Sequence, residues 1–80
     1  MKTRMARVAE LVCEEMIRGA KDHGVYASLH EAYAVILEEL DEAWEQVKRN
    51  ATQAAVMEFL HVAATAQRVV MEYMEGLPDE

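Results

Sequence analysis

Residues 29–49 read LHEAYAVILEELDEAWEQVKR, and the spacing of their apolar side chains predicts one long amphipathic helix. The apolar positions recur every three or four residues and share one narrow arc of a helical wheel: Leu29, Tyr33, Ile36, Leu37, Leu40, Trp44 and Val47. Glu39 and Glu42 lie about 60° apart on the neighbouring arc, among the small apolar side chains of Ala32, Val35 and Ala43. Since an unpaired carboxylate is costly to bury, these two acids are candidates for a partly buried functional pair.

A short loop and another helix precede this stretch. Residues 3–22 carry a single apolar stripe at helical spacing. Gly24 suits the position just after a helix end, and Ser28 with Glu31 forms a capping box that begins the next helix.

Five polar residues of this region have simple interpretations. We expect Glu15, at the edge of the stripe, to be solvated and Glu14 to pair with Arg18 one turn along the helix. His23 and Tyr26 are placed to touch a nucleotide base or sugar, but ordinary loop packing is the favoured interpretation.

A third helix follows residues 29–49. Residues 51–75 are apolar around most of the wheel, but their stripe is well out of phase with the preceding one, by more than about 100°. A break near Asn50, with Asn50 and Gln53 as capping residues, removes the mismatch and predicts an antiparallel helical pair. A helix that is apolar on most sides needs more neighbours than three helices supply. We therefore expect an all-α chain of three helices that assembles into a homodimer or higher homo-oligomer with a four-helix-bundle core.

The composition bounds the class of protein. Eighty residues form a single domain, 1–80, and a chain this short commonly gains stability by self-association. A formal charge of −7 argues against nucleic acid and anionic membranes as partners. The lone Cys13 suits a reducing compartment, and the chain reads as having neither a signal peptide nor a membrane anchor, so we expect a cytoplasmic protein.

The hairpin register brings acidic residues to matching heights. Glu42 lies eight residues before residue 50 and Glu58 eight after it, and Glu39 and His61 each lie eleven away. In an antiparallel pair, Glu42 and Glu58 would each stand roughly 12 Å from the turn. Mg²⁺ and Mn²⁺ prefer hard oxygen ligands, so these residues form a candidate metal site.

These residues resemble a known family motif. Glu38-Glu39-x-x-Glu42 followed by Glu58-x-x-His61 is similar to the paired motif of the MazG-like all-α nucleoside triphosphate pyrophosphohydrolases, over roughly residues 20–72, and the surrounding sequence resembles short phage- and prophage-type members. The resemblance implies an oligomeric helical bundle that binds Mg²⁺ and converts a nucleoside triphosphate to the monophosphate and pyrophosphate. It also implies that Glu39, Glu42 and Glu58 are metal ligands and that Glu38 is a supporting catalytic acid.

The chain departs from the family at His61, where the motif usually has Asp. Imidazole is a poor ligand for magnesium and a good one for manganese, iron or zinc, so His61 as a fourth ligand points to altered metal choice or a degenerate enzyme. Lys48, Arg49 and Arg68 are the nearby basic residues, and we expect Lys48 and Arg68 to contact substrate phosphates.

Two alternatives remain open from the residues alone. Glu58-x-x-His61 on one helix and a Glu from another form half of the carboxylate-bridged di-iron or di-manganese arrangement of four-helix bundles, and a homodimer would supply the other half. The second alternative is a helical oligomerisation module without chemistry, in which the acids only aid solubility.

Overall fold

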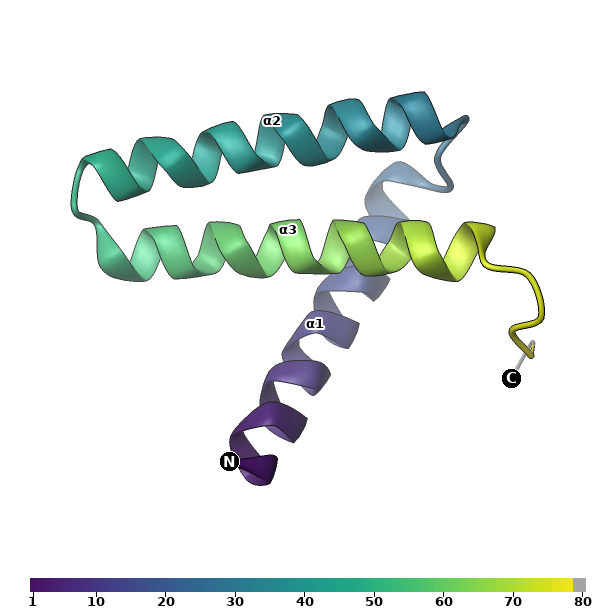
Figure 1. The fold of residues 1–80 in the computed structure, drawn as a ribbon, viewed down its shortest axis with the longest axis horizontal. Helices are drawn as coiled ribbons and strands as arrows, with labels where there is room; N and C mark the ends of the chain where they lie inside the picture. The colour runs from purple at the N-terminus through teal and green to yellow at the C-terminus, as the bar shows by residue number, and fades with distance from the viewer. Residues whose placement is uncertain (79–80) are drawn as a thin grey trace.

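The computed structural model describes residues 1–78, and its elements in this range are three α-helices. They are α1 (Lys2–His23), α2 (Leu29–Lys48) and α3 (Thr52–Tyr73). α2 and α3 run side by side as an antiparallel hairpin, while α1 crosses α3 at a steep angle and packs on it near its own C-terminal half (Figure 1). The predicted all-α, three-helix chain is confirmed.

The loop between α1 and α2 has the expected capping chemistry. Gly24 adopts a positive φ of 69°, a conformation that glycine reaches without steric cost, and its N–H donates to the Ala20 carbonyl at 3.0 Å. The Ser28 hydroxyl oxygen accepts a hydrogen bond from the Glu31 N–H at 3.1 Å, which begins α2. The glycine at the helix end and the Ser28 cap are confirmed. The reciprocal half of the capping box differs, because the Glu31 carboxylate accepts from the Ala27 N–H at 3.4 Å in place of the Ser28 N–H.

The turn between α2 and α3 is built differently from the prediction. Asn50 is a left-handed turn residue, with φ 58°, and its N–H donates to the Val47 carbonyl at 3.0 Å. Ala51 occupies the N-cap position of α3, and no side chain caps that end. Asparagine suits this place because it tolerates the left-handed region better than most residues, so the chain breaks at Asn50 by turn chemistry and not by a side-chain cap.

Small residues form the contact between α2 and α3. Ala32 and Ala43 of α2 are 1% and 0% exposed, and Ala55 and Ala64 of α3 are also buried. These alanines allow the two helix backbones to approach closely. The arc of α2 that meets α3 is therefore the one that carries Ala32, Ala43 and Glu39, which brings that acid toward the interior.

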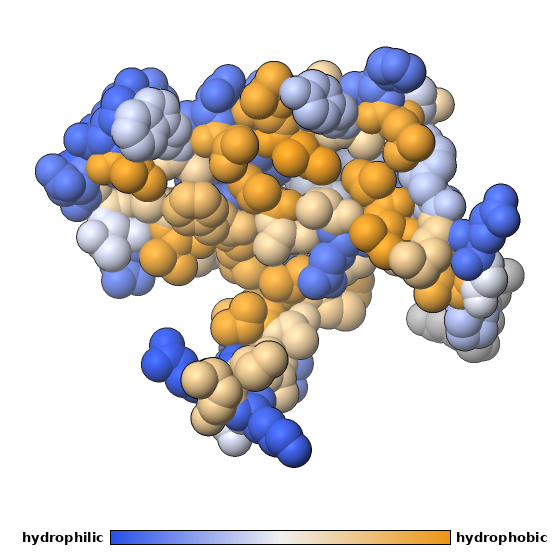
Figure 2. Space-filling model, viewed as in Figure 1, coloured by the Kyte–Doolittle hydropathy of each residue, from blue (hydrophilic) through white to orange (hydrophobic). Residues whose placement is uncertain are grey.

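The large apolar side chains of the hairpin lie on its open face. Those of α2 are 39–68% exposed: Leu29, Tyr33, Leu37, Leu40, Trp44 and Val47. Val56, Phe59 and Val70 of α3 are each about half exposed, so α3 in a single chain is less enclosed than its apolar sequence predicts. Figure 2 shows apolar side chains spread over both helices on the face turned to the viewer.

The exposed surface is large for a chain of this mass. A compact monomer of 9.1 kDa exposes about 4,900 Å², whereas this chain exposes 6371 Å². The excess is about 1,500 Å². The exposed apolar side chains of the hairpin and the exposed residues 2–10 of α1 contribute to it. Among residues 1–78, no helix is long and apolar enough to cross a membrane.

Candidate functional site

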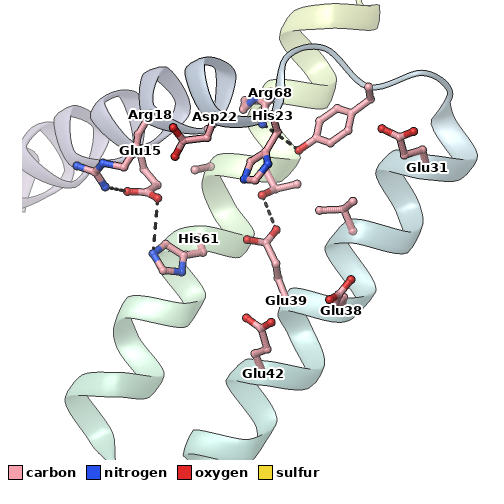
Figure 3. A pocket seen from close by; sticks show the side chains of 15 residues that line it. Glu15, Arg18, Asp22, His23, Glu31, Glu38, Glu39, Glu42, His61 and Arg68 are labelled. Atoms are coloured by element: carbon pink, nitrogen blue, oxygen red, sulfur yellow. Dashed lines mark hydrogen bonds and ion pairs between the residues drawn. The ribbon is translucent and has the colours of Figure 1, made fainter.

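A cleft of about 610 Å³ opens where all three helices converge, beside the α1–α2 loop (Figure 3). Its walls come from the C-terminal half of α1, the acidic arc of α2 and the middle of α3. Six carboxylate residues line it: Glu15, Asp22, Glu31, Glu38, Glu39 and Glu42. Arg18, Arg68, His23 and His61 also line it, so acidic groups outnumber fixed cations by three to one.

Glu42 and Glu58 meet across the hairpin, as their equal distances from the turn predict. The expectation that both acids of α2 are partly buried holds for Glu39 and is wrong for Glu42, which is exposed. Slight desolvation nevertheless raises the pKa of Glu42, and the neighbouring carboxyls of Glu58, Glu38 and Glu39 and a hydrogen bond with Glu58 raise it further. Glu58 Oε2 is buried and has no hydrogen-bond partner among the described residues. Two facing carboxyl groups in this state favour either a shared proton or a bound cation.

Glu38 and Glu39 differ in their surroundings. Glu39 is half-buried, and its Oε1 accepts a hydrogen bond from the Thr65 hydroxyl of α3 at 2.5 Å. Glu38 is exposed at the rim of the cleft. Thr65 thus holds one oxygen of Glu39, and Glu38 remains free to turn toward a ligand.

His61 lies between two carboxylates from different helices. Its Nδ1 is 3.5 Å from Glu58 Oε2, and its Nε2 is 3.6 Å from Glu15 Oε1. Glu15, expected to be solvated, has a side chain only 18% exposed, and Arg18 forms an ion pair with it in place of the predicted Glu14–Arg18 pair. Glu15 is therefore a site residue that the sequence did not reveal, because only the crossing of α1 over α3 brings it to His61.

The carboxylate oxygens of the site are of the type that a hard divalent cation prefers, but they do not converge on one point. Within residues 1–78, no three His, Cys, Asp or Glu side chains form a group that could hold a metal ion in their present conformations. Glu39, Glu42 and Glu58 supply oxygen atoms, as Mg²⁺ and Mn²⁺ prefer, and the buried Glu58 Oε2 has no hydrogen-bond partner among the described residues, with His61 Nδ1 lying 3.5 Å away. Rotation of exposed glutamate side chains is the change that binding would require.

Arg68 forms the opposite end of the cleft and is 3% exposed. Its Nη1 donates to the Tyr26 hydroxyl at 3.3 Å, and its Nη2 donates to the Gly24 carbonyl and pairs with Glu72 at 3.4 Å. The guanidinium carbon also lies 4.6 Å from the centroid of the Tyr26 ring, a cation–π distance. Arg68 thus lines the cleft as predicted for a substrate-binding residue, but its present contacts tie the loop to α3.

Further contacts secure the same loop. The Tyr26 N–H donates to Glu72 Oε1 at 2.9 Å, and the Tyr73 hydroxyl donates to the Tyr26 carbonyl at 3.1 Å. A Cβ added at Gly19 would lie 3.0 Å from Arg68 Nη1, so glycine leaves room for the guanidinium. Tyr26 packs in the loop, as the favoured interpretation predicts, and both Tyr26 and His23 also line the cleft.

Lys48 lies outside the site. It pairs with Glu45 at 2.9 Å and stands 5.8 Å from the centroid of the Trp44 ring, at the exposed C-terminal end of α2. Lys48 does not line the cleft, so the structure gives no contact that supports its predicted role with substrate; Arg18 lines the cleft instead.

Comparison of the chain with protein-family models, with curated proteins and with solved structures gives no match.

Proposed function

We propose that this chain is a divalent-metal-dependent nucleoside triphosphate pyrophosphohydrolase of the MazG-like type, or a degenerate descendant of one, and that it acts in the acidic cleft. The observation that carries the proposal is the meeting of Glu42 and Glu58 across the hairpin. The raised pKa of Glu42 and the buried Glu58 Oε2, which has no hydrogen-bond partner among the described residues, support a concentration of negative charge whose only nearby basic group is the His61 ring, 3.5 Å from Glu58 Oε2.

The residues have distinct roles in this proposal. Glu39, Glu42 and Glu58 would hold Mg²⁺ or Mn²⁺, with Glu38 as a supporting acid and His61 as a ligand that favours manganese. The bound ion supplies neutralisation of triphosphate charge and activation of a water molecule. Thr65 fixes Glu39, and Glu58 and Glu15 hold the His61 ring from either side.

The shape and charge of the cleft support a nucleotide-sized ligand. Its volume of about 610 Å³ lies within the range of small-molecule sites. A triphosphate would be repelled by the six carboxylates unless cations accompanied it, which makes the proposed reaction metal-dependent. Arg18 and Arg68 line the walls and supply the only fixed positive charge at the cleft among the described residues.

We also propose that the active species is a homodimer in which two α2–α3 hairpins form a four-helix core. An excess exposed surface of about 1,500 Å² exceeds the roughly 800 Å² that each partner buries in a standard interface. The open face of the hairpin carries Leu37, Leu40, Trp44 and Phe59, which a second copy would remove from water. These side chains are typical of the centre of an obligate interface.

Turnover of purified protein tests the catalytic proposal. We expect the native chain to release pyrophosphate and a monophosphate from at least one nucleoside triphosphate with Mn²⁺ or Mg²⁺, and no product with chelator. Glu42→Gln and Glu58→Gln should each lower kcat at least 100-fold, whereas Glu14→Gln, an exposed acid outside the cleft, should leave it unchanged. Metal binding without turnover of any of the common ribo- and deoxyribonucleotides would instead support a metal-binding helical protein and contradict the enzyme.

A further inference from the structure

The N-terminal half of α1, residues 2–11, projects from the rest of the molecule and is called the arm below. All residues from Lys2 to Glu10 are exposed, and the packing of α1 begins at Val12, which is buried. The apolar stripe nevertheless continues outward along the arm, with Met5 64% and Val8 53% exposed. A helical segment of about ten residues is only marginally stable in water unless its apolar side packs against another surface. The exposed apolar stripe of the arm is therefore a candidate for contact with another molecule.

A groove already follows this stripe. Met5, Val8 and Val12 of α1 form its wall with Gln67 of α3, and it encloses about 660 Å³. The groove is continuous with the α1–α3 contact, because Val12, which is buried there, also lines it. An occupant of this groove would extend the existing core outward.

The arm and the apolar face of the hairpin point to the same side of the molecule. In Figure 1 the C-terminal half of α1 fades behind α3, while its N-terminal end is drawn in full colour toward the viewer. The face turned to the viewer in the same orientation is the one that carries the exposed apolar side chains, and this apolar surface continues from α3 onto the arm (Figure 2). A molecule seated on the hairpin face would therefore lie beside the arm.

Charge separates the arm from the body of the protein. Residues 1–9 contain three of the eight basic residues, Lys2, Arg4 and Arg7, and no acid. All fifteen acidic residues lie on the remainder of the chain. Arg7 pairs with Glu10 at 2.8 Å, while Lys2 and Arg4 have no carboxylate partner among residues 1–78. A basic arm on an acidic body is complementary to a second copy of the same body.

Given the self-association proposed above, we propose that the arm clasps a second copy of this chain, with its Met5–Val8 stripe against the outer edge of that copy's α2. Because α2 and α3 are antiparallel, a twofold axis along the helices places α2 of the second copy over α3 and keeps every neighbouring pair antiparallel. The arm emerges past α3, so it crosses the outer edge of that α2 at the same steep angle at which α1 crosses α3. Asp41 and Glu45 are exposed beside the apolar stripe of α2, and Glu45 pairs with Lys48 on its own helix. In the proposed dimer these two acids of the second copy would meet Lys2 and Arg4 of the arm.

The arrangement has two signatures in solution. Its apolar component lowers the dissociation constant of the dimer at any salt concentration, whereas its charged component weakens as salt screens the exposed pairs. A dimer formed by the hairpin faces alone, with no contact to the arm, would show neither signature.

Sedimentation equilibrium over a range of protein concentrations tests the clasp on the full chain. We expect Met5→Ser with Val8→Ser, and separately Lys2→Glu with Arg4→Glu, to raise the dimer dissociation constant at least tenfold. The control Glu14→Lys changes charge on α1 outside the arm and should leave the constant unchanged. Adding Asp41→Lys and Glu45→Lys to the charge-reversed arm should restore dimerisation and reverse the loss.

Three results would overturn the clasp. A dimer whose dissociation constant is unchanged by both arm variants would show that the arm touches no partner, while the hairpin dimer would stand. Failure of the Asp41→Lys, Glu45→Lys chain to rescue the reversed arm would exclude this edge of α2 as the docking surface. A native chain that stays monomeric at every concentration would refute the clasp and the proposed dimer together, without bearing on metal binding.

Discussion

Replacing Arg68 by Met tests the tie between the α1–α2 loop and α3. Methionine retains much of the aliphatic volume but removes the guanidinium, which is 3% exposed. The change leaves the Tyr26 hydroxyl and the Gly24 carbonyl without their donor and leaves the Glu72 carboxylate, 10% exposed, without its cation. Removing one partner of a buried ion pair costs about 3–5 kcal/mol, because the remaining charge stays desolvated.

That loss is a large part of the total stability. A chain of eighty residues has a free energy of unfolding of about 4–12 kcal/mol. With a urea m-value of about 1 kcal/mol per molar, the midpoint should fall by roughly 3 M or more in equilibrium unfolding followed by far-UV circular dichroism at fixed protein concentration. Arg49→Met, an exposed cation at the end of α2, is the matched control and should change stability by less than about 0.5 kcal/mol.

If Arg68→Met is largely unfolded, a double-mutant cycle with Glu72 still tests the ion pair. Adding Glu72→Leu to Arg68→Met removes the stranded carboxylate and should recover about 1–3 kcal/mol. A loss below about 1 kcal/mol for Arg68→Met would refute the reasoning, since it would mean that the guanidinium contributes no more than an exposed charge.

Three further predictions concern the site, the loop and the helix contact. The folded-state pKa of Glu42 lies above its ordinary value of 4.5, so ionising this group costs stability as pH rises through the folded pKa, and the cost is absent below the unfolded pKa. Glu42→Gln should therefore raise the metal-free melting temperature at about pH 7 and leave it unchanged at about pH 3; an equal effect at both pH values would contradict the assigned cause. Ser28→Ala removes the hydroxyl that accepts from the Glu31 N–H and should cost about 1 kcal/mol in urea unfolding, whereas Ser28→Asp should preserve the cap. Ala43→Leu forces a large side chain into a position that is 0% exposed between α2 and α3 and should cost about 1–3 kcal/mol; wild-type stability would show that the helices can separate freely there.

Local chemistry made the helices and their ends predictable. Gly24 and the Ser28–Glu31 pair mark the α1–α2 loop, because a positive φ and an orphan N–H each require particular residue types. The meeting of Glu42 with Glu58 follows from helix register alone, since equal distances from a turn give equal heights in an antiparallel pair. Asn50 was correctly placed at the break, although it serves as a left-handed turn residue and not as a cap.

The face of each helix that packs against its neighbour is harder to predict. A helical wheel shows which side of a helix is apolar, but it does not show which other helix that side contacts. The largest apolar stripe of α2, which includes Leu40 and Trp44, faces outward, while the alanine arc meets α3. The wheel gives no reason to prefer Ala43 over Leu40 as a contact residue within one chain. The preference arises from backbone approach within the chain and, in the dimer proposed here, from a second copy that covers the larger side chains.

Polar contacts between residues far apart in the sequence cannot be predicted from a helical wheel either. Glu15 joins the site only because α1 crosses α3 at the height of His61, and a crossing angle has no local sequence signature. Arg68 looks like a free cation on a polar stripe, but Gly19 and Tyr26 enclose it. The small residue Gly19, which leaves space for a long side chain such as that of Arg68, is the one sequence signal that could have indicated this burial.

The most direct test of the central claim, that Glu42 and Glu58 together hold a divalent cation, is thermal unfolding with and without Mn²⁺ or Mg²⁺. Ligand bound only to the folded state at about 100 times its dissociation constant stabilises by about 2.7 kcal/mol, which raises the midpoint of so small a chain by roughly ten degrees or more. We predict a rise of this kind for the native chain with millimolar Mn²⁺ and its loss in Glu58→Gln, with Glu14→Gln behaving as native. An unchanged midpoint in the native chain, or an equal rise in Glu58→Gln, would contradict the metal site.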